Sequence, residues 1–182
     1  MVQKALRSTA ERVLDWSAEA ILAQLLADHL RRQAGYRGSE HRSWEASLPI
    51  LAQDLVDAGL GQVEMMLEYK LPVAGTRADV VLSGVDPQTG EDSYVVVELK
   101  QWSSAETVYN SDRIVRAHGL PGEQLHPIAQ VRGYCKYLTQ NVEVLHNRPH
   151  AVYGVAYLHN ATQNSISTLR AGHADRFGRM FT

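Results

Sequence analysis

Residues 77–102 read RADVVLSGVDPQTGEDSYVVVELKQW, and this stretch decides the fold. Two apolar runs, 78–82 and 94–100, flank a segment rich in Gly, Pro, Asp and Thr, which is the pattern of a β-hairpin. Because side chains alternate between the faces of a strand, Glu98 and Lys100 share one face of the second run. The run is otherwise apolar on both sides. We therefore predict a strand covered on both faces that ends in two opposite charges.

Asp79 places a second carboxylate on the first run, beside the apolar residues 80–82. Charges are seldom placed on buried strands unless they are paired or bound to a metal. Carboxylates on two neighbouring strands, with a lysine two residues after the second, could hold a divalent metal and a water molecule. The alternative is structural: Glu98 and Lys100 form an ordinary ion pair at a sheet end. The order D…E-x-K on two interior strands favours the functional interpretation.

The pattern Asp79…Glu98-Leu99-Lys100 resembles the signature of the PD-(D/E)xK nuclease superfamily, with Ala78 in place of the nominal proline. Four segments closely resemble the N-terminal nuclease-like module of bacterial nuclease–helicase fusions: EYKLP at 68–72, RADVVLSG at 77–84, VVVELKQW at 95–102 and HPIAQVRGY at 126–134. The resemblance implies metal-dependent hydrolysis of phosphodiester bonds in DNA. It implies that Mg²⁺ or Mn²⁺ is held by Asp79, Glu98 and the main-chain carbonyl of Leu99, and that Lys100 orients the attacking water.

A helix is predicted over 126–141, because proline is favoured in a first turn. Gln130 and Tyr134 lie four residues apart and share one face of it. The resemblance to RecB-like nucleases, in which Q-x-x-x-Y follows the E-x-K strand and lines the DNA path, implies a supporting role for both. A Gln/Tyr pair is also common on any half-buried helix. Arg132 and Lys136 form a second pair at this spacing and could meet the nucleic-acid backbone.

Two more acidic residues are candidates. A strand over 63–71 that forms a hairpin with the strand of Asp79 would put Glu68 on the same face. There Glu68 could contact the metal or position Lys100, or it could instead pair across the strands with Arg77 or Lys70; both roles stay open.

A capping-box pattern at 8–11 opens a long amphipathic helix that runs to about residue 32. A second helix is predicted to begin near 43–47, because Pro49 suits a first turn, and to end at Gly59. Glu45 lies near its start, where some superfamily members carry an acid. The helix macrodipole also favours an acid there without any catalytic role.

Residues 103–125 are predicted to form a long loop with scattered Ser, Asn, Gly and Pro, and such loops tend to be functional or mobile. Arg113 and Arg116 lie in it and could contact phosphates, although solvated loop charges are the default interpretation. A last apolar strand is predicted over 151–158, followed by a polar tail.

A chain of 182 residues, 45% of them hydrophobic, predicts one domain with a sizeable core. We expect an α/β, restriction-endonuclease-like core with a central mixed sheet of about four strands flanked by helices, and an N-terminal helical extension. Its parts would be N-terminal helices over 1–61, a catalytic core over 62–158 and a tail over 159–182.

The formal net charge of −2 argues against a protein that grips polyanions by bulk charge, although a metal site is itself acidic until filled. The single cysteine, Cys135, rules out an internal disulfide framework and fits a reducing cytosol. No run approaches the ~20 apolar residues of a membrane span, and the first residues lack the apolar core of a signal peptide. A cytoplasmic location without membrane contact is therefore expected.

The sequence has no G-x-x-x-x-G-K-[ST] loop, so it holds no ATP-driven motor, and a helicase would be a separate domain or subunit. The competing function from another class is a catalytically silent module that binds nucleic acid or assists assembly. The intact Asp79, Glu98 and Lys100 argue against it, because a silent module needs none of the three.

Overall fold

The computed structural model describes residues 5–31, 41–71, 76–109, 111–171 and 175–182. They form two compact units, Met1–Val85 and Asp86–Thr182. The fold is α/β, with a mixed sheet of six strands and a separate sheet of three short strands. The predicted α/β class and mixed sheet are confirmed, and the predicted count of about four strands is too low.

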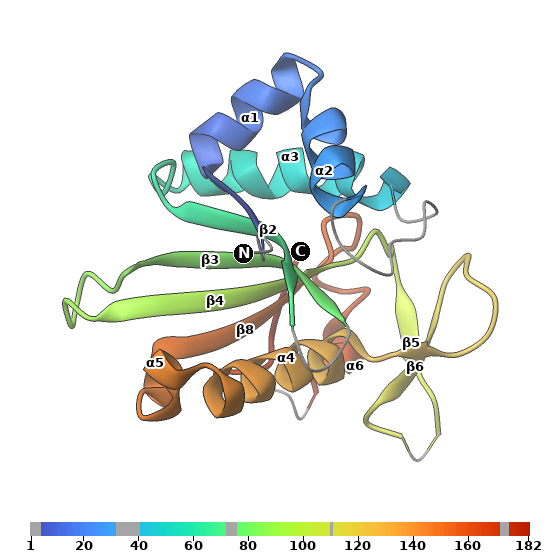
Figure 1. Cartoon of the computed structure of the whole chain (residues 1–182). Helices are drawn as coiled ribbons and strands as arrows, with labels where there is room; N and C mark the ends of the chain where they lie inside the picture. The colour runs from blue at the N-terminus through green and yellow to red at the C-terminus, as the bar shows by residue number, and fades with distance from the viewer. Residues whose placement is uncertain (1–4, 32–40, 72–75, 110, 172–174) are drawn as a thin grey trace. The chain divides into compact units, whose positions relative to one another are not determined.

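Three antiparallel strands form the sheet of the first unit (Figure 1): β1 Leu6–Thr9, β2 Glu64–Lys70 and β3 Arg77–Val85. The predicted strands over 63–71 and 78–82 correspond to β2 and β3. Strand β1 is missing from the prediction, because its sequence LRST has no apolar alternation and only its pairing with β2 makes it a strand. The register of β1 places Leu6 opposite Leu67.

Three helices accompany this sheet: α1 Ala10–Ala18, α2 Leu22–Arg31 and α3 His41–Asp57. The cap of α1 is Thr9, whose hydroxyl oxygen accepts a hydrogen bond from the N–H of Arg12 at 3.3 Å. The predicted single long helix is wrong: it is divided after α1 by Ala20, whose φ of 57° lies in the left-handed region and cannot continue a helix. Pro49 lies inside α3, not in its first turn, because the helix already begins at His41.

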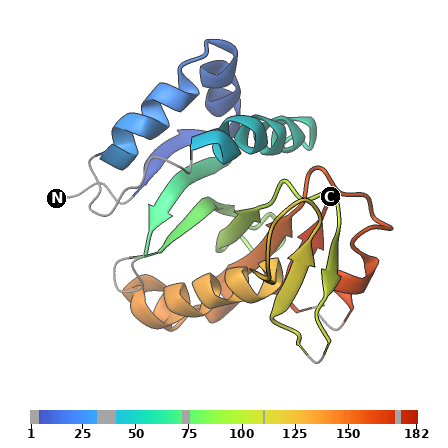
Figure 2. The ribbon, with the colours of Figure 1, turned by 90° about the vertical axis from the view of Figure 1, so that its right-hand side faces the viewer.

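The second unit has three parallel strands, β4 Asp92–Leu99, β8 Val152–Tyr157 and β9 Arg179–Phe181. Helix α4, Pro127–Asn141, lies along β4 and β8 (Figures 1 and 2) and buries a stripe of apolar side chains. These elements match the predicted strands over 94–100 and 151–158 and the predicted helix over 126–141. Two short helical segments, α5 Glu143–His146 and η2 Pro149–Ala151, connect α4 to β8.

The C-terminal segment is not the polar tail that its composition predicts. It contains helix α6, Ser167–Arg170, and strand β9, which pairs with β8. Ile166, Leu169 and Met180 are buried in the core of the second unit. These apolar residues are too widely spaced to give a periodic pattern, so the sequence alone does not reveal the packing.

Three short antiparallel strands replace the loop predicted over 103–125: β5 Ala105–Thr107, β6 Ile114–Ala117 and β7 Gln124–Leu125. We call them the β5–β7 sheet. Ala105, Val115 and Ala117 are buried in a hydrophobic cluster that also contains Trp102 and Ile128. The buried residues are small and sparse, which explains why the segment resembles a loop. None of the helices in the described part of the chain is long and apolar enough to span a bilayer.

Cys135, on the buried face of α4, makes the packing of the second unit testable. Burial, and secondarily the Asp175 carboxylate, raise the pKa of the thiol from 9.0 to about 12, although Arg176 acts in the opposite direction. The thiol of the unfolded chain therefore ionises at lower pH than the native thiol, so Cys135 contributes stability below about pH 9 that is lost as the pH rises towards 12.

We expect Cys135 in the native protein to resist iodoacetamide at pH 8, because the thiolate is the reactive form. Alkylation should follow the unfolded fraction across a urea titration. Alkylation of the native protein at the rate of a free cysteine would contradict the packing of α4 on β8.

Candidate active site

Glu98 and Lys100 form a close, largely buried ion pair at the end of β4. Nζ of Lys100 lies 2.6 Å from Oε1 of Glu98, and the side chains are 20% and 2% exposed. Parallel pairing with β8 holds β4 through residue 99, and the N–H of Lys100 donates to the carbonyl of Tyr157 at 2.9 Å. A carboxylate buried this deeply loses its hydration. It is therefore a costly feature that the fold retains, unlike an ordinary ion pair on the surface.

The same lysine is connected to α4, whose sequence is far from the E-x-K motif. Nζ of Lys100 donates to Oε1 of Gln130 at 3.4 Å, and Nε2 of Gln130 donates to the hydroxyl of Tyr134 at 2.8 Å. We call these three residues, together with Glu98, the polar chain. The predicted i,i+4 contact between Gln130 and Tyr134 is thus present, and it faces Lys100.

The start of α4 determines where Gln130 points. His126 is fully buried, and its Nδ1 accepts a hydrogen bond from the N–H of Ile128 at 3.1 Å, which caps the helix. Pro127 occupies the first turn, as predicted, and the N–H of Gln130 donates to the carbonyl of His126 at 3.0 Å. This cap fixes the first residue of the helix, and therefore the face on which Gln130 and Tyr134 lie.

The main-chain carbonyl of Leu99, the third expected metal ligand, points away from β8. Backbone groups of successive residues in a strand point to opposite edges, and Lys100 is directed towards β8 by its bond to Tyr157. The carbonyl of Leu99 therefore points to the other edge of β4.

In the first unit, Asp79 lies on β3 and is half-buried. The ladder pairs Leu67 with Val80 and Tyr69 with Ala78, so Glu68 and Asp79 are at opposing positions between these pairs. The prediction that Glu68 falls on the face of Asp79 agrees with this register.

Glu68 also has the partner named as its alternative. Nε of Arg77 lies 3.1 Å from Oε2 of Glu68, and their side chains are 15% and 3% exposed. The φ of Glu68 is 51°, which is uncommon for a non-glycine residue within a strand and costs on the order of 1–3 kcal/mol. A strained, buried acid beside Asp79 is a feature often found at functional sites. Glu45 lies in α3, but its side chain is outside the described part of the structure.

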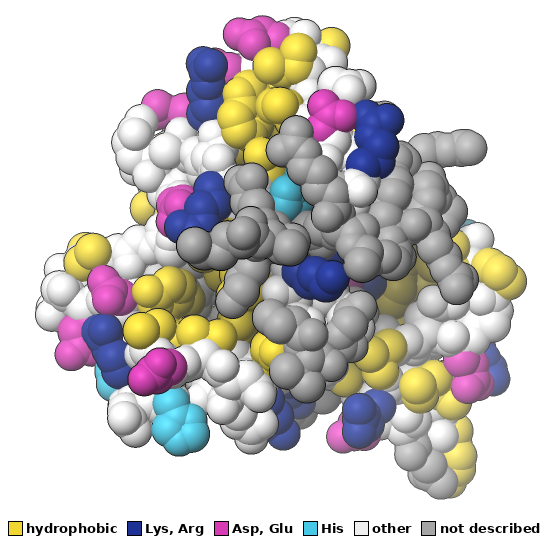
Figure 3. All heavy atoms as spheres, in the orientation of Figure 1, with side chains coloured by type: hydrophobic (Ala, Val, Ile, Leu, Met, Phe, Trp, Pro, Cys, Tyr) yellow, Lys and Arg dark blue, Asp and Glu magenta, His cyan; other side chains and the backbone are white. Residues whose placement is uncertain are grey.

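Of the four basic residues predicted to bind nucleic acid, two form ion pairs with acidic side chains. Arg116 on β6 pairs with Glu123 at 2.9 Å, and Arg132 on α4 pairs with Asp175 at 2.8 Å. Arg113 and Lys136 are exposed. On the face drawn in Figure 3, Lys and Arg side chains stand beside Asp and Glu side chains, which agrees with the net charge of −2.

The donors that could hold a metal are oxygens. Within the described ranges, no cluster of three or more His, Cys, Asp or Glu side chains is arranged as a metal site. The ligands that the family resemblance implies are the carboxylates of Asp79 and Glu98, one from each unit, and the main-chain carbonyl of Leu99. Mg²⁺ and Mn²⁺ favour oxygen ligands and Mg²⁺ usually keeps several waters, so the chemistry of these donors fits such an ion.

Two residues near the polar chain are missed by the sequence analysis. His126 is hidden because its role depends on the backbone of α4. Trp102 has a visible signal, since it continues the alternation of Glu98 and Lys100, and Nζ of Lys100 lies 5.5 Å from the centroid of its ring.

No protein-family model matches the sequence, and no curated protein matches it. Among solved structures, the chain is similar to a repair endonuclease from Pyrococcus abyssi, with a TM-score of 0.40 and 19% sequence identity. The match covers 82% of this chain and 48% of that one, so the chain spans less than half of that protein's length.

Proposed function

We propose that this protein is a metal-dependent nuclease that hydrolyses phosphodiester bonds in DNA. The observation that supports the proposal best is the polar chain, because it joins the two parts of the sequence pattern, E-x-K and Q-x-x-x-Y, through Lys100. Thirty positions separate Lys100 from Gln130, so this contact is not a local consequence of the sequence. A silent module would have no reason to keep a buried acid, a lysine and a glutamine in contact.

Each residue has a role that follows from its chemistry. Glu98, Asp79 of the first unit and the Leu99 carbonyl would hold Mg²⁺ or Mn²⁺; such an ion, when bound, lowers the pKa of a coordinated water and offsets charge on phosphate oxygens. Lys100 would donate hydrogen bonds to the attacking water and to the phosphate as its negative charge grows. Gln130 holds the lysine, and Tyr134 holds the Gln130 amide in the orientation that presents its oxygen to Lys100.

A substrate panel tests the proposal. The panel contains labelled single-stranded, duplex and branched DNA and matched RNA, each with Mg²⁺, Mn²⁺ or EDTA. We expect cleavage of DNA with Mg²⁺ or Mn²⁺ and none with EDTA. Binding of nucleic acid without cleavage, with either metal ion, would instead support the catalytically silent module. A helicase domain or subunit is a proposed partner, and its addition to the assay would test whether it stimulates cleavage.

Gln130→Ala and Tyr134→Phe test the role of the helix. Gln130→Ala removes the group that Lys100 contacts, and we expect roughly a tenfold loss in single-turnover rate with little change in the unfolding midpoint, because Gln130 is only half-buried. Tyr134→Phe removes only a hydroxyl, so its effect should be smaller and in the same direction. Rates equal to wild type in both variants would assign this face of α4 to packing alone.

A further inference from the structure

The indole of Trp102 contacts the same ammonium as the polar chain and has no role in the function proposed above. Its ring centroid lies 5.5 Å from Nζ of Lys100, within the range of a cation–π interaction. The ammonium is thus surrounded by three groups of the second unit: the Glu98 carboxylate, the Gln130 amide oxygen and the indole ring.

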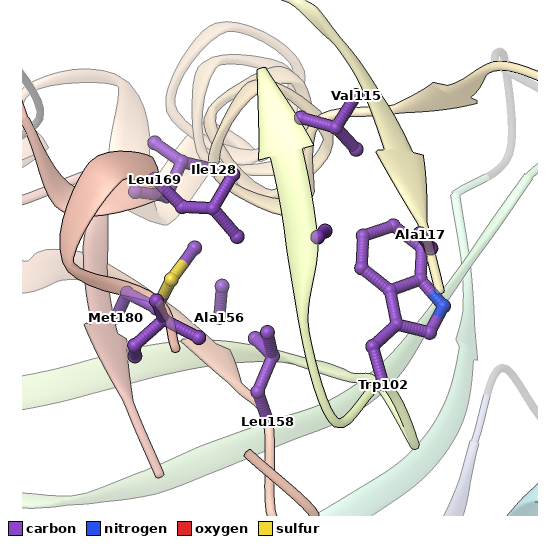
Figure 4. Close-up of a cluster of buried hydrophobic side chains, with 10 residues drawn as sticks. Trp102, Val115, Ala117, Ile128, Ala156, Leu158, Leu169 and Met180 are labelled. Atoms are coloured by element: carbon purple, nitrogen blue, oxygen red, sulfur yellow. The ribbon is translucent and has the colours of Figure 1, made fainter. Parts of the chain in front are cut away.

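Trp102 itself is held firmly. It is 8% exposed and belongs to a cluster of buried side chains from β5, β6, α4, β8 and the C-terminal segment. Figure 4 shows its ring beside Ala117, at the side of the cluster formed by the β5–β7 sheet. A tryptophan has only two rotatable side-chain bonds, so a packed indole is a rigid surface.

A rigid neighbouring surface restricts the position of a lysine ammonium, which its own side chain does not fix. The ammonium is a compact charge on a flexible four-carbon stem, with no planar geometry to restrict where it points. Among the described residues, Lys100 donates to Glu98 and Gln130, and an ammonium has three donors. The indole attracts the charge without accepting either of these bonds. It therefore fixes Nζ and leaves a donor for the substrate.

We infer that Trp102 is a positioning residue for Lys100, and that it links the β5–β7 sheet to the proposed reaction. The inference rests on the proposed nuclease function. It assigns no chemistry to the indole, which acts only through the lysine.

The first test compares cleavage by Trp102→Leu, Trp102→Phe and the control Val115→Ala. Val115 is fully buried in the same cluster, on β6. We expect Trp102→Leu to lower the single-turnover rate roughly tenfold with KM unchanged, and Trp102→Phe to keep most of the rate because a phenyl ring retains a π face. Val115→Ala should lower the unfolding midpoint but not this rate. Equal rate losses in Val115→Ala and Trp102→Leu, in step with stability, would overturn the inference.

A second test changes the electrons of the Trp102 ring but not its shape, so that misfolding does not explain a loss of cleavage. In a Trp16→Phe/Trp44→Phe background, Trp102 is the only tryptophan left, and it can be replaced by fluorinated tryptophans of increasing fluorine content. Fluorine weakens the negative face of the ring with little change in its shape, so the cleavage rate should fall stepwise. A rate independent of fluorination would show that the indole acts only by filling space.

A double-mutant cycle on stability tests the contact between Lys100 and Trp102 without any measurement of cleavage. The shift that Lys100→Met causes in the urea midpoint should be smaller when Trp102 is leucine than when it is tryptophan. Additive midpoints would refute the contact itself. A wild-type protein that cleaves nothing, yet shows the coupling, would refute the nuclease function and with it the catalytic role, while the contact would stand.

Discussion

Glu98→Gln and Asp79→Asn are each expected to lower the rate of metal-dependent cleavage roughly 10³-fold while leaving the fold intact. Both substitutions keep the volume of the side chain and remove the charge that a divalent ion requires. A metal ion contributes several kcal/mol to transition-state stabilisation, and about 4 kcal/mol corresponds to a rate loss of roughly 10³. The measurement is single-turnover cleavage of labelled DNA, with Mg²⁺ and with Mn²⁺, alongside calorimetric titration of each ion.

The two variants should differ in stability. Glu98→Gln breaks the 2.6 Å pair with Lys100, but Lys100 is 20% exposed and can regain hydration, so the loss should stay near 1–2 kcal/mol. Asp79→Asn keeps the shape and hydrogen-bonding capacity of a half-buried side chain on β3, so its effect on the midpoint should be smaller than that of Glu98→Gln. Glu143→Gln, at an exposed position at the start of α5, is the matched control and should behave as wild type. Wild-type cleavage by either site variant would refute the ligand assignment.

The local parts of the site are predictable from the sequence. Glu98 and Lys100 lie two apart on a strand, and Gln130 and Tyr134 lie four apart on a helix, so strand and helix periodicity alone bring each pair together. The pairing of Glu68 with Arg77 also follows from a hairpin whose register the apolar residues set. In each case the contact depends on one element or on one turn.

The contact between Lys100 and Gln130 could not be predicted in this way. It depends on how α4 packs on β4 and β8, and on the His126 cap that fixes the rotation of the helix. The resemblance to a nuclease family implied only a supporting role for Gln130 and Tyr134 and did not predict their connection to Lys100. The β5–β7 sheet is missed for a related reason, because small buried residues such as Ala105 and Ala117 carry little hydrophobic signal.

The sequence patterns also fail to predict the short strands at the sheet edges. Strand β1 has four residues and β9 has three, and both exist because a longer neighbour offers its backbone groups. Their sequences satisfy the partner and carry no pattern of their own. The left-handed φ at Ala20, which divides the first helix, is likewise invisible in a sequence whose helical periodicity continues on both sides.

Lys100→Met separates chemistry from ion pairing. Methionine keeps most of the aliphatic stem, so packing near Glu98 should survive, and the substitution removes only the ammonium. We expect a rate loss of roughly 10²–10³, because positioned donors act mainly on the charge that develops in the transition state. Lys70→Met, at the end of β2, makes the same chemical change elsewhere and should leave the rate unchanged.

Metal binding decides between the two roles of Lys100. Calorimetric affinity for Mg²⁺ or Mn²⁺ should persist or increase in Lys100→Met, because the substitution removes a cation that lies 2.6 Å from the proposed ligand Glu98. If Lys100 served only as the partner of Glu98, cleavage would fall slightly and in proportion to stability. Lost cleavage with retained metal binding therefore assigns the lysine to the reaction, and retained cleavage would return it to the ion pair.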